Sequence, residues 1–164
     1  MTLGDKKMAD GKVNKIRKIT ENRKAYHDYH ILKRLEVGIA LKGTEVKSIR
    51  EGHFSLGEAY VVVRDGELFL VGAHISPYKE GNRFNPDPIR DRKLLAHRHE
   101  IDSLSASVQQ KGMTLVPLKA YFSRGRVKLE IGLARGKKQY DKREAIRERD
   151  TDREMQRQVK KFYR

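Results

Sequence analysis

Apolar and polar residues alternate in short runs through the middle of the chain, and Gly, Asn, Asp or Pro separate the runs. The clearest pair is Tyr60–Arg64 and Glu67–Val71, which flank Asp65-Gly66, the dipeptide favoured in a type I′ hairpin turn. Earlier strand-like runs cover 29–35, 37–42 and 44–50. Val46 and Ile49 break strict alternation in the last of these, which favours a bend or bulge there.

The second half of the pattern predicts one helix and two more strands. A long loop covers 79–91, and we expect Asp91 to cap a helix that starts at Arg92 and stops at Gly112. The apolar face of this helix would carry Leu94, Ile101, Leu104 and Val108. Strands follow at 114–122 and 126–133, with Pro117 at an edge or bulge.

Many short strands with few helices predict a mainly β fold. The expected architecture is a small antiparallel β-barrel of the oligonucleotide-binding kind, with helices at its edges, and an open α+β sheet is the alternative. We divide the chain into a flexible basic arm at 1–20, this barrel at 21–135 and a basic tail at 136–164.

The tail is too polar to bury a core of its own. It has 11 Lys/Arg and 6 Asp/Glu, and no Gly or Pro after Gly136. Wound as a helix, it would carry a basic row (Arg149, Arg153, Arg157 and Lys161) roughly opposite an acidic one (Glu144, Glu148 and Asp152). We therefore expect a segment that is disordered alone and helical against a polyanion; a frayed surface helix without a partner is the alternative.

Charge narrows the class of partner. The net charge is +15, and each of the three parts 1–24, 25–135 and 136–164 carries an excess of +5. A basic excess on the body as well as both arms favours nucleic acid. A membrane-surface protein would need a basic helix with a broad apolar face, and neither arm has one. There is no Cys, no apolar run of membrane-spanning length and no apolar signal-peptide core, so we expect a soluble, cytoplasmic protein.

Candidate chemistry is weak. His27 with His30, and His97 with His99, do not form convergent ligand sets, so no metal site is predicted. Glu36 with Glu45 could serve nuclease chemistry, but without an Asp-rich cluster they are better explained as partners of Lys or Arg on the barrel surface. No phosphate-binding glycine pattern is present, and we expect no enzyme and no cofactor.

One short motif suits RNA. Residues 22–27 (Asn-Arg-Lys-Ala-Tyr-His) combine cations with flat rings at the entry to the sheet. Cations neutralise phosphate and rings stack on unpaired bases. A solvated strand entry would have the same composition, so the motif alone leaves both interpretations open.

Seven blocks, in order and without large gaps over about residues 20–150, carry a resemblance to one family. They are Asn22-Arg-Lys-Ala-x-His-Asp-Tyr29, Gly38-Ile-Ala-Leu-x-Gly-Thr-Glu-Val-Lys-Ser48, Gly66-Glu-Leu-Phe-Leu70, His74-Ile-Ser-Pro-Tyr78, Arg90-Asp-Arg-Lys-Leu-Leu95, Gly112-Met-Thr-Leu-Val-Pro117 and Gly132-Leu-Ala-Arg-Gly-Lys-Lys-x-Tyr-Asp-Lys-Arg-Glu144. Together they resemble the SsrA-binding protein (small protein B) family of bacterial trans-translation.

The resemblance implies an RNA-binding adaptor with an oligonucleotide-binding type of β-barrel. Such a protein binds the tRNA-like domain of transfer-messenger RNA (tmRNA) and delivers it to stalled ribosomes, so that nascent chains are tagged and ribosomes rescued. The implied partners are tmRNA and the ribosome, at the decoding centre and mRNA path of the small subunit, and we expect a monomer. A ribosome-binding translation factor of similar fold, without tmRNA specificity, is the alternative.

The resemblance also implies site residues. On the RNA-binding face it places Asn22, Lys24, His27, Glu36, Arg92, Lys93 and Leu95. Glu36 has the wrong sign for phosphate, so we expect it to accept from a base amino group or a 2′-hydroxyl. In the ribosome-binding tail the resemblance places Gly136, Lys137, Lys138, Tyr140, Asp141, Lys142 and Arg143. Tyr140 stands where some relatives have His, and either ring can stack on a base.

Overall fold

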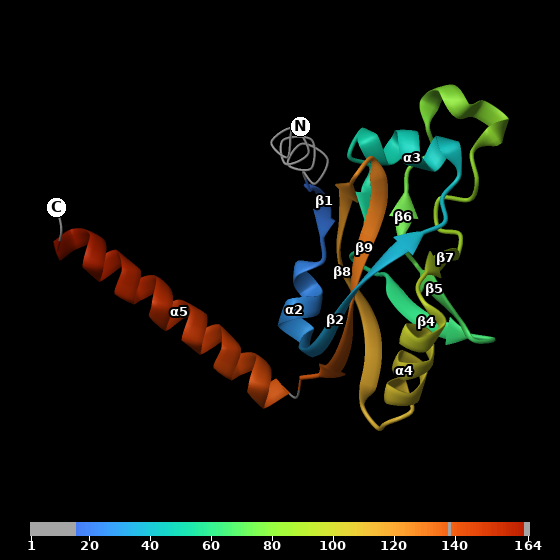
Figure 1. Cartoon of the computed structure of the whole chain (residues 1–164). Coiled ribbons are helices and arrows are strands. Elements are labelled where there is room, and N and C mark those ends of the chain that lie inside the picture. Colours follow the sequence, from blue (N-terminus) through green and yellow to red (C-terminus); the bar gives the residue numbers. More distant parts are fainter. Residues whose placement is uncertain (1–15, 138, 163–164) are drawn as a thin grey trace, which may run out of the picture.

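The computed structural model describes residues 16–137 and 139–162 of the chain. Most of its strands belong to one large antiparallel sheet (Figure 1). These strands are β1 (Arg17–Glu21), β2 (Tyr29–Ile39), β4 (Tyr60–Arg64), β5 (Glu67–Val71), β7 (Arg92–Leu95), β8 (Met113–Ser123) and β9 (Arg126–Gly136). Two short strands, β3 (Phe54–Ser55) and β6 (His74–Ile75), pair separately.

The strand pairings close on themselves. The order is β1-β8-β4-β5-β7-β2-β9, and β9 also pairs with β8. Six strands from β8 round to β9 therefore form a circuit of neighbours, to which β1 is added through β8. The main core takes residues from these strands, including Leu68, Leu70, Leu115, Leu129 and Ile131.

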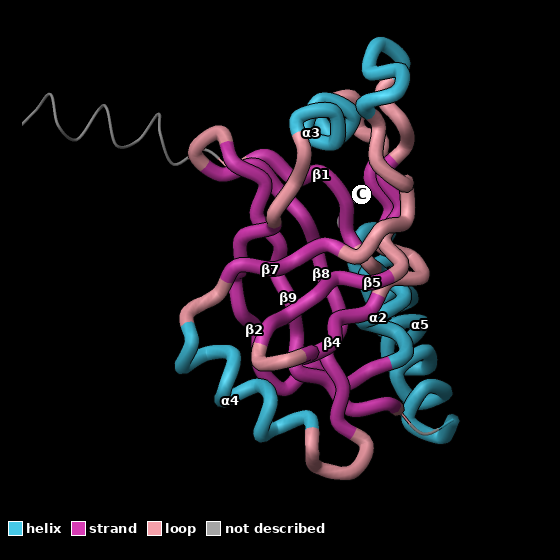
Figure 2. Tube along the Cα trace, turned by 90° about the vertical axis from the view of Figure 1, so that its right-hand side faces the viewer, coloured by secondary structure: helices cyan, strands magenta, loops and turns pink. Residues whose placement is uncertain are grey.

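Helices cover the ends and one side of the sheet. Helix α2 (Arg23–Asp28) packs against β8 and β2, and its Ala25 belongs with Val116, Leu118 and Ala134 to a second, smaller core. Helix α3 (Gly43–Arg50) and the 3-10 segment η1 (Lys79–Phe84) lie at one end, and α4 (Arg98–Val108) lies near the other (Figure 2). Helix α5 (Gln139–Phe162) extends away from the sheet past α2 (Figure 1).

Several predictions from the pattern are confirmed. The hairpin pairs Arg64 with Glu67, and φ is +52° at Asp65 and +73° at Gly66, as a type I′ turn needs. Ile101 and Leu104 are the buried residues of α4. The register between β8 and β9 shifts between Pro117 and Lys119, so a bulge does lie at this proline.

Other predictions are wrong. Residues 43–50 are helical, because Val46 and Ile49, three apart, share one face of a helix and Glu45 accepts from the Lys42 N–H at its start. Arg92–Leu95 is a strand rather than the start of a helix, and the helix begins at Arg98. Residues 29–39 form one continuous strand.

The expected division of the chain also needs two corrections. Order begins before residue 21, because Arg17–Glu21 is paired with β8. Strand β9 runs to Gly136, which is therefore the last residue of the sheet instead of the first of the tail. The remainder of the predicted arm, residues 1–15, lies outside the described residues.

Candidate nucleic-acid interface

The outer face of β2 and β7 brings two of the predicted site residues together. Glu36 and Gly38 are two apart on β2, and Leu95 on β7 is the register partner of Gly38. A Cβ on Gly38 would lie 3.2 Å from the Leu95 Cβ, so the close approach of this side chain needs a residue without one. Leu95 is 53% exposed although it belongs to a sheet strand.

Glu36 is held in place by a buried tyrosine. The Tyr121 hydroxyl donates to Glu36 Oε2, and Tyr121 itself is only 5% exposed. Burial raises the pKa of Tyr121, and the hydrogen bond and negative charge of Glu36 raise it further. The hydroxyl therefore stays protonated at neutral pH and acts as the donor, and among residues 16–137 and 139–162 it is the hydrogen-bond partner that Glu36 has.

Cations surround this carboxylate. A cavity of about 710 Å³ is lined by Ile16, Glu36, Ser123, Arg124, Arg126 and Lys128. A second one, of about 220 Å³, lies between Gly38, Leu95, Arg126 and Lys128 among others. The two hollows share Arg126 and Lys128, so Glu36 and Leu95 border one continuous stretch of cationic surface.

Lys93 shares this face, because it lies two residues before Leu95 on the same strand. Its Nζ is 2.9 Å from Glu67 Oε1, and both side chains are about half-exposed. We call Glu36, Lys93, Leu95, Arg126 and Lys128 the sheet face.

Sequence reasoning missed Tyr121, Arg126 and Lys128. Lys128 lies between the buried Val127 and Leu129, so its outward direction could be read from alternation. Its position beside Gly38 depends on the pairing of strands that are ninety residues apart in the chain, which no local pattern gives.

The other predicted contacts, Asn22, Lys24 and His27, form a separate group at α2. Asn22 is buried: its Nδ2 donates to the Pro117 carbonyl and its Oδ1 accepts from the Ala25 N–H. Lys24 lies 3.6 Å from Glu58, and His27 Nδ1 lies 2.9 Å from the Asp28 carboxylate. The resemblance places Asn22 on the RNA-binding face, but its side-chain amide is bonded within the protein, where it fixes the start of α2 on the sheet.

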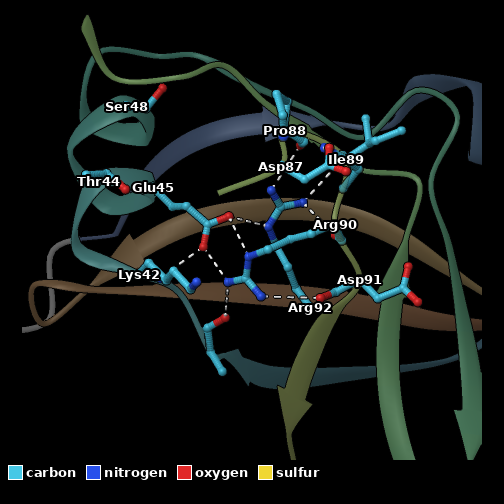
Figure 3. A network of polar contacts seen from close by, with 12 residues as sticks. Lys42, Thr44, Glu45, Ser48, Asp87, Pro88, Ile89, Arg90, Asp91 and Arg92 are labelled. Carbon is cyan, nitrogen blue, oxygen red and sulfur yellow. Dashed lines mark hydrogen bonds and ion pairs between the residues drawn. The ribbon is translucent and has the colours of Figure 1, made fainter. Parts of the chain in front are cut away.

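Arg92 is wrong as a surface contact. Its side chain is fully buried, and its guanidinium donates to Glu45 Oε2 and to the carbonyls of Ala73, Arg90 and Pro88 (Figure 3). A guanidinium with these partners cannot reach a phosphate. Arg92 therefore stabilises the fold and is not part of the sheet face.

Glu45 is the centre of this buried cluster, which Arg90 completes. Burial alone would raise the pKa of Glu45, but hydrogen bonds from Arg90, the Lys42 N–H and Arg92 outweigh burial and lower it. Glu45 is 2% exposed. The prediction that it pairs with Arg is confirmed, but its place on the surface is wrong.

The tail begins from a fixed point. The Lys137 N–H donates to the Asp28 carbonyl at 2.9 Å and its Nζ donates to the Tyr26 carbonyl at 3.2 Å. Arg143 is exposed on α5, whereas Lys138 and the side chains of Tyr140, Asp141 and Lys142 lie outside the described residues. All the side chains that the structure describes on α5 are exposed.

Among residues 16–137 and 139–162, no group of three or more His, Asp and Glu is placed to hold a metal ion. No helix among the described residues has the length and hydropathy needed to cross a membrane.

Proteins of one family are similar to this chain over most of its length. The model of the family described as "SmpB protein" matches residues 19–161. The SsrA-binding protein of Caldicellulosiruptor bescii is 56% identical over 93% of this chain and 97% of its own length. The SsrA-binding protein of Acetivibrio thermocellus is 58% identical over 90% of this chain and 96% of its own length. A solved chain from "tmRNA-SmpB: a journey to the center of the bacterial ribosome" is 52% identical, with a TM-score of 0.62 over 78% of this chain and 94% of that one.

The fold and the sheet face define the class of this protein. It is a small β protein whose antiparallel sheet carries cations, a hydrogen-bonding carboxylate and an exposed apolar side chain, a surface suited to nucleic acid. Within that class the family is shown by the match over most of the chain. The chain belongs to the SmpB protein family.

Proposed function

We propose that this protein is an RNA-binding adaptor of trans-translation. It binds the tRNA-like domain of tmRNA and delivers it to stalled ribosomes, without catalysing a reaction itself. The observation that carries this proposal is the near full-length match to proteins named SsrA-binding protein, together with the likeness to a chain from a tmRNA-SmpB ribosome structure. Its place of action is the cytoplasm, where stalled ribosomes occur.

The closed circuit of strands supports a finer description of the fold. We take β8, β4, β5, β7, β2 and β9 as a small β-barrel with an oligonucleotide-binding topology. In this arrangement the sheet face lies on the outside of the barrel, away from the core and open to RNA.

The sheet face has the chemistry for folded RNA with splayed bases. Lys93, Arg126 and Lys128 would neutralise phosphates, and Leu95 would contact an unstacked base. Glu36, oriented by Tyr121, would accept from a base amino group or a 2′-hydroxyl. Lys24 and His27 would supply a second contact at α2, and Asn22 would act through the position of that helix.

The tail would contact the ribosome. Gly136, Lys137, Lys138, Tyr140, Asp141, Lys142 and Arg143 form its first part. The exposure of the described α5 side chains means that the helix gains little from packing on its own protein. We propose that α5 is stabilised mainly by rRNA, so that it is weakly populated alone and helical on the ribosome.

The direct test is a gel-shift titration of the tRNA-like domain at about 150 mM salt with elongator tRNA as competitor, because affinity for RNA depends on salt. We expect tight binding that elongator tRNA does not displace. Equal binding to both RNAs would overturn tmRNA specificity and favour a ribosome-binding factor instead.

The division of labour between body and tail has its own test. Leu95→Ala or Asn22→Ala should weaken binding to the tRNA-like domain. Variants at Tyr140, Asp141 or Lys142 should keep that binding yet lose tagging of nascent chains in a reconstituted translation system. Tail variants that lost RNA affinity as strongly as Leu95→Ala would contradict this division.

A further inference from the structure

At the end of the sheet where α3 and η1 meet, the structure exposes an aromatic ring that the sheet face does not use. Phe84, the last residue of η1, is 69% exposed. The Arg83 guanidinium lies 5.2 Å from the centre of its ring, and Lys47 Nζ lies 5.6 Å from that of Tyr78. A cavity of about 370 Å³ is bordered by Lys42, Thr44, Lys47, Tyr78, Glu80 and Phe84, among others.

Phe84 is held outward by a well-bonded segment. Asn85 accepts from the Tyr78 N–H at 2.9 Å, and its amide donates to the Tyr78 carbonyl at 2.8 Å, so the two ends of η1 are tied together. Gly81 packs so closely that a Cβ would lie 2.9 Å from the Asn85 amide and 3.0 Å from Thr44 on α3. The exposure of Phe84 is therefore built into the segment.

The anchorage of this segment is shared with the buried cluster. Arg90 and Arg92, which follow η1 in the chain, both donate to Glu45 on α3 (Figure 3). Breaking these bonds would free the loop that carries Phe84 from the helix that carries Lys47. The cluster thus keeps the ring and the cations in one arrangement.

We propose that α3 and η1 form a second RNA-binding surface, on which an unpaired nucleotide stacks against Phe84 while Lys42, Lys47 and Arg83 neutralise its phosphates. An exposed ring among cations is the combination used for single-stranded RNA. Glu80, which accepts from the Tyr78 hydroxyl at 3.3 Å, adds an acceptor for a 2′-hydroxyl. A protein partner fits less well, because one exposed ring among charges is far from an extended apolar patch.

This surface goes beyond the proposed function, because Phe84, Arg83 and Lys47 are not sheet-face residues and need no folded tRNA-like partner. Its ligand is a single strand. The two activities can therefore be measured separately on the same full-length protein.

The experiment is fluorescence anisotropy of a labelled uridine oligonucleotide of about eight residues, at about 150 mM salt. Phe84→Ala should weaken binding about tenfold, the loss typical of one stacked base. Ile89→Ala is the matched control, because Ile89 is 58% exposed in the following loop but does not border the cavity. The proposal is overturned if the two variants bind equally well, or if the wild-type protein does not bind the oligonucleotide. Phe84 would then be explained as a contact for another protein.

A second arm tests whether the surface is separate. With the tRNA-like domain bound at saturation, the oligonucleotide should bind the wild type with unchanged affinity; displacement would overturn a separate surface. If the wild type does not bind the tRNA-like domain, the proposed function fails. The comparison of Phe84→Ala with Ile89→Ala still decides the inference.

Discussion

Glu45 and Glu36 are two carboxylates only nine residues apart in the chain, and the fold uses them in opposite ways. Glu45 is 2% exposed and receives hydrogen bonds from two guanidinium groups and one backbone N–H. Glu36 is exposed and receives one from Tyr121, on a surface lined with cations.

The difference shows how to tell a structural acid from a binding one. Every strong acceptor direction of Glu45 is occupied by groups of the same protein, so it has nothing left for a ligand. In the part of the chain that the structure describes, Glu36 is oriented by one donor, the Tyr121 hydroxyl. A carboxylate that is fixed by one buried donor and otherwise open is prepared to recognise a hydrogen-bond donor on another molecule.

The largest expected effect comes from breaking the buried cluster. Glu45→Gln leaves two guanidinium groups without their counter-charge, and loss of one partner of a buried pair typically lowers the free energy of unfolding by about 3–5 kcal/mol. Urea denaturation followed by circular dichroism would measure it. Arg64→Gln is the control, because its exposed pair with Asp91 at 3.2 Å should matter by less than about 1 kcal/mol. Similar losses in both variants would contradict the assignment.

The same cluster should make stability depend on acid. The pKa of Glu45 is lowered in the folded protein from an ordinary value of 4.5, so its ionised form favours folding. This contribution is complete above pH 4.5 and is lost as the pH falls through the lower folded-state pKa. Below pH 4.5 the unfolding free energy of the wild type should therefore fall more steeply than that of Glu45→Gln. Parallel curves would show that Glu45 titrates normally.

Glu36→Ala should act on RNA instead of stability. Loss of one good base contact corresponds to about 1–3 kcal/mol, or roughly 5- to 150-fold in affinity for the tRNA-like domain. The thermal midpoint should fall much less than in Glu45→Gln, because one neutral donor, the Tyr121 hydroxyl, loses its partner rather than two guanidinium groups. Asp102→Ala serves as control, because Asp102 is an exposed acid paired with Arg98 on α4 and is in neither proposed RNA contact. If Glu36→Ala had a thermal midpoint as low as that of Glu45→Gln, the distinction between a binding and a structural carboxylate would be wrong.

A smaller effect is expected from Tyr121→Phe. This variant keeps the ring in the core but removes the donor that orients Glu36, so RNA affinity should fall by roughly two- to tenfold. The loss should disappear when Glu36 is already Ala. A double-mutant cycle in the gel-shift assay measures this, and additive losses would show that Tyr121 does not act through Glu36.

The smallest expected change is at Lys93. Lys93→Gln should reduce the slope of log affinity against log salt by about 0.7–0.9, the value for one phosphate contact. Affinity should fall similarly for different RNA sequences, because a phosphate contact does not read bases. Lys33→Gln, an exposed lysine on β2, should leave the slope unchanged.

The local sequence pattern predicted the structure correctly where the interacting residues are close together in the chain. The hairpin at Asp65-Gly66 and the buried face of α4 at Ile101 and Leu104 follow from turn chemistry and periodicity. The resemblance to a family supplied Glu36 and Leu95, which the structure places on neighbouring strands.

The strand Arg92–Leu95 shows why other parts of the fold and site could not be predicted from the sequence. Its burial alternates, with Arg92 and Leu94 inside and Lys93 and Leu95 outside, as in a strand. The pattern is hidden in the sequence because the first inward residue is an arginine, which is rarely buried without a partner. That partner is Glu45, forty-seven residues earlier. The same long-range pair removed Arg92 from the predicted RNA-binding residues.

The anchored root of α5 gives the tail the properties of a lever. Lys137 is tied to the Asp28 and Tyr26 carbonyls, and a helix of 24 residues starts two positions later. At 1.5 Å per residue this helix is about 36 Å long, so a tilt of about 10° at the root carries its far end by about 6 Å. Small adjustments beside α2 are thus magnified into displacements the size of a nucleotide step at the tip.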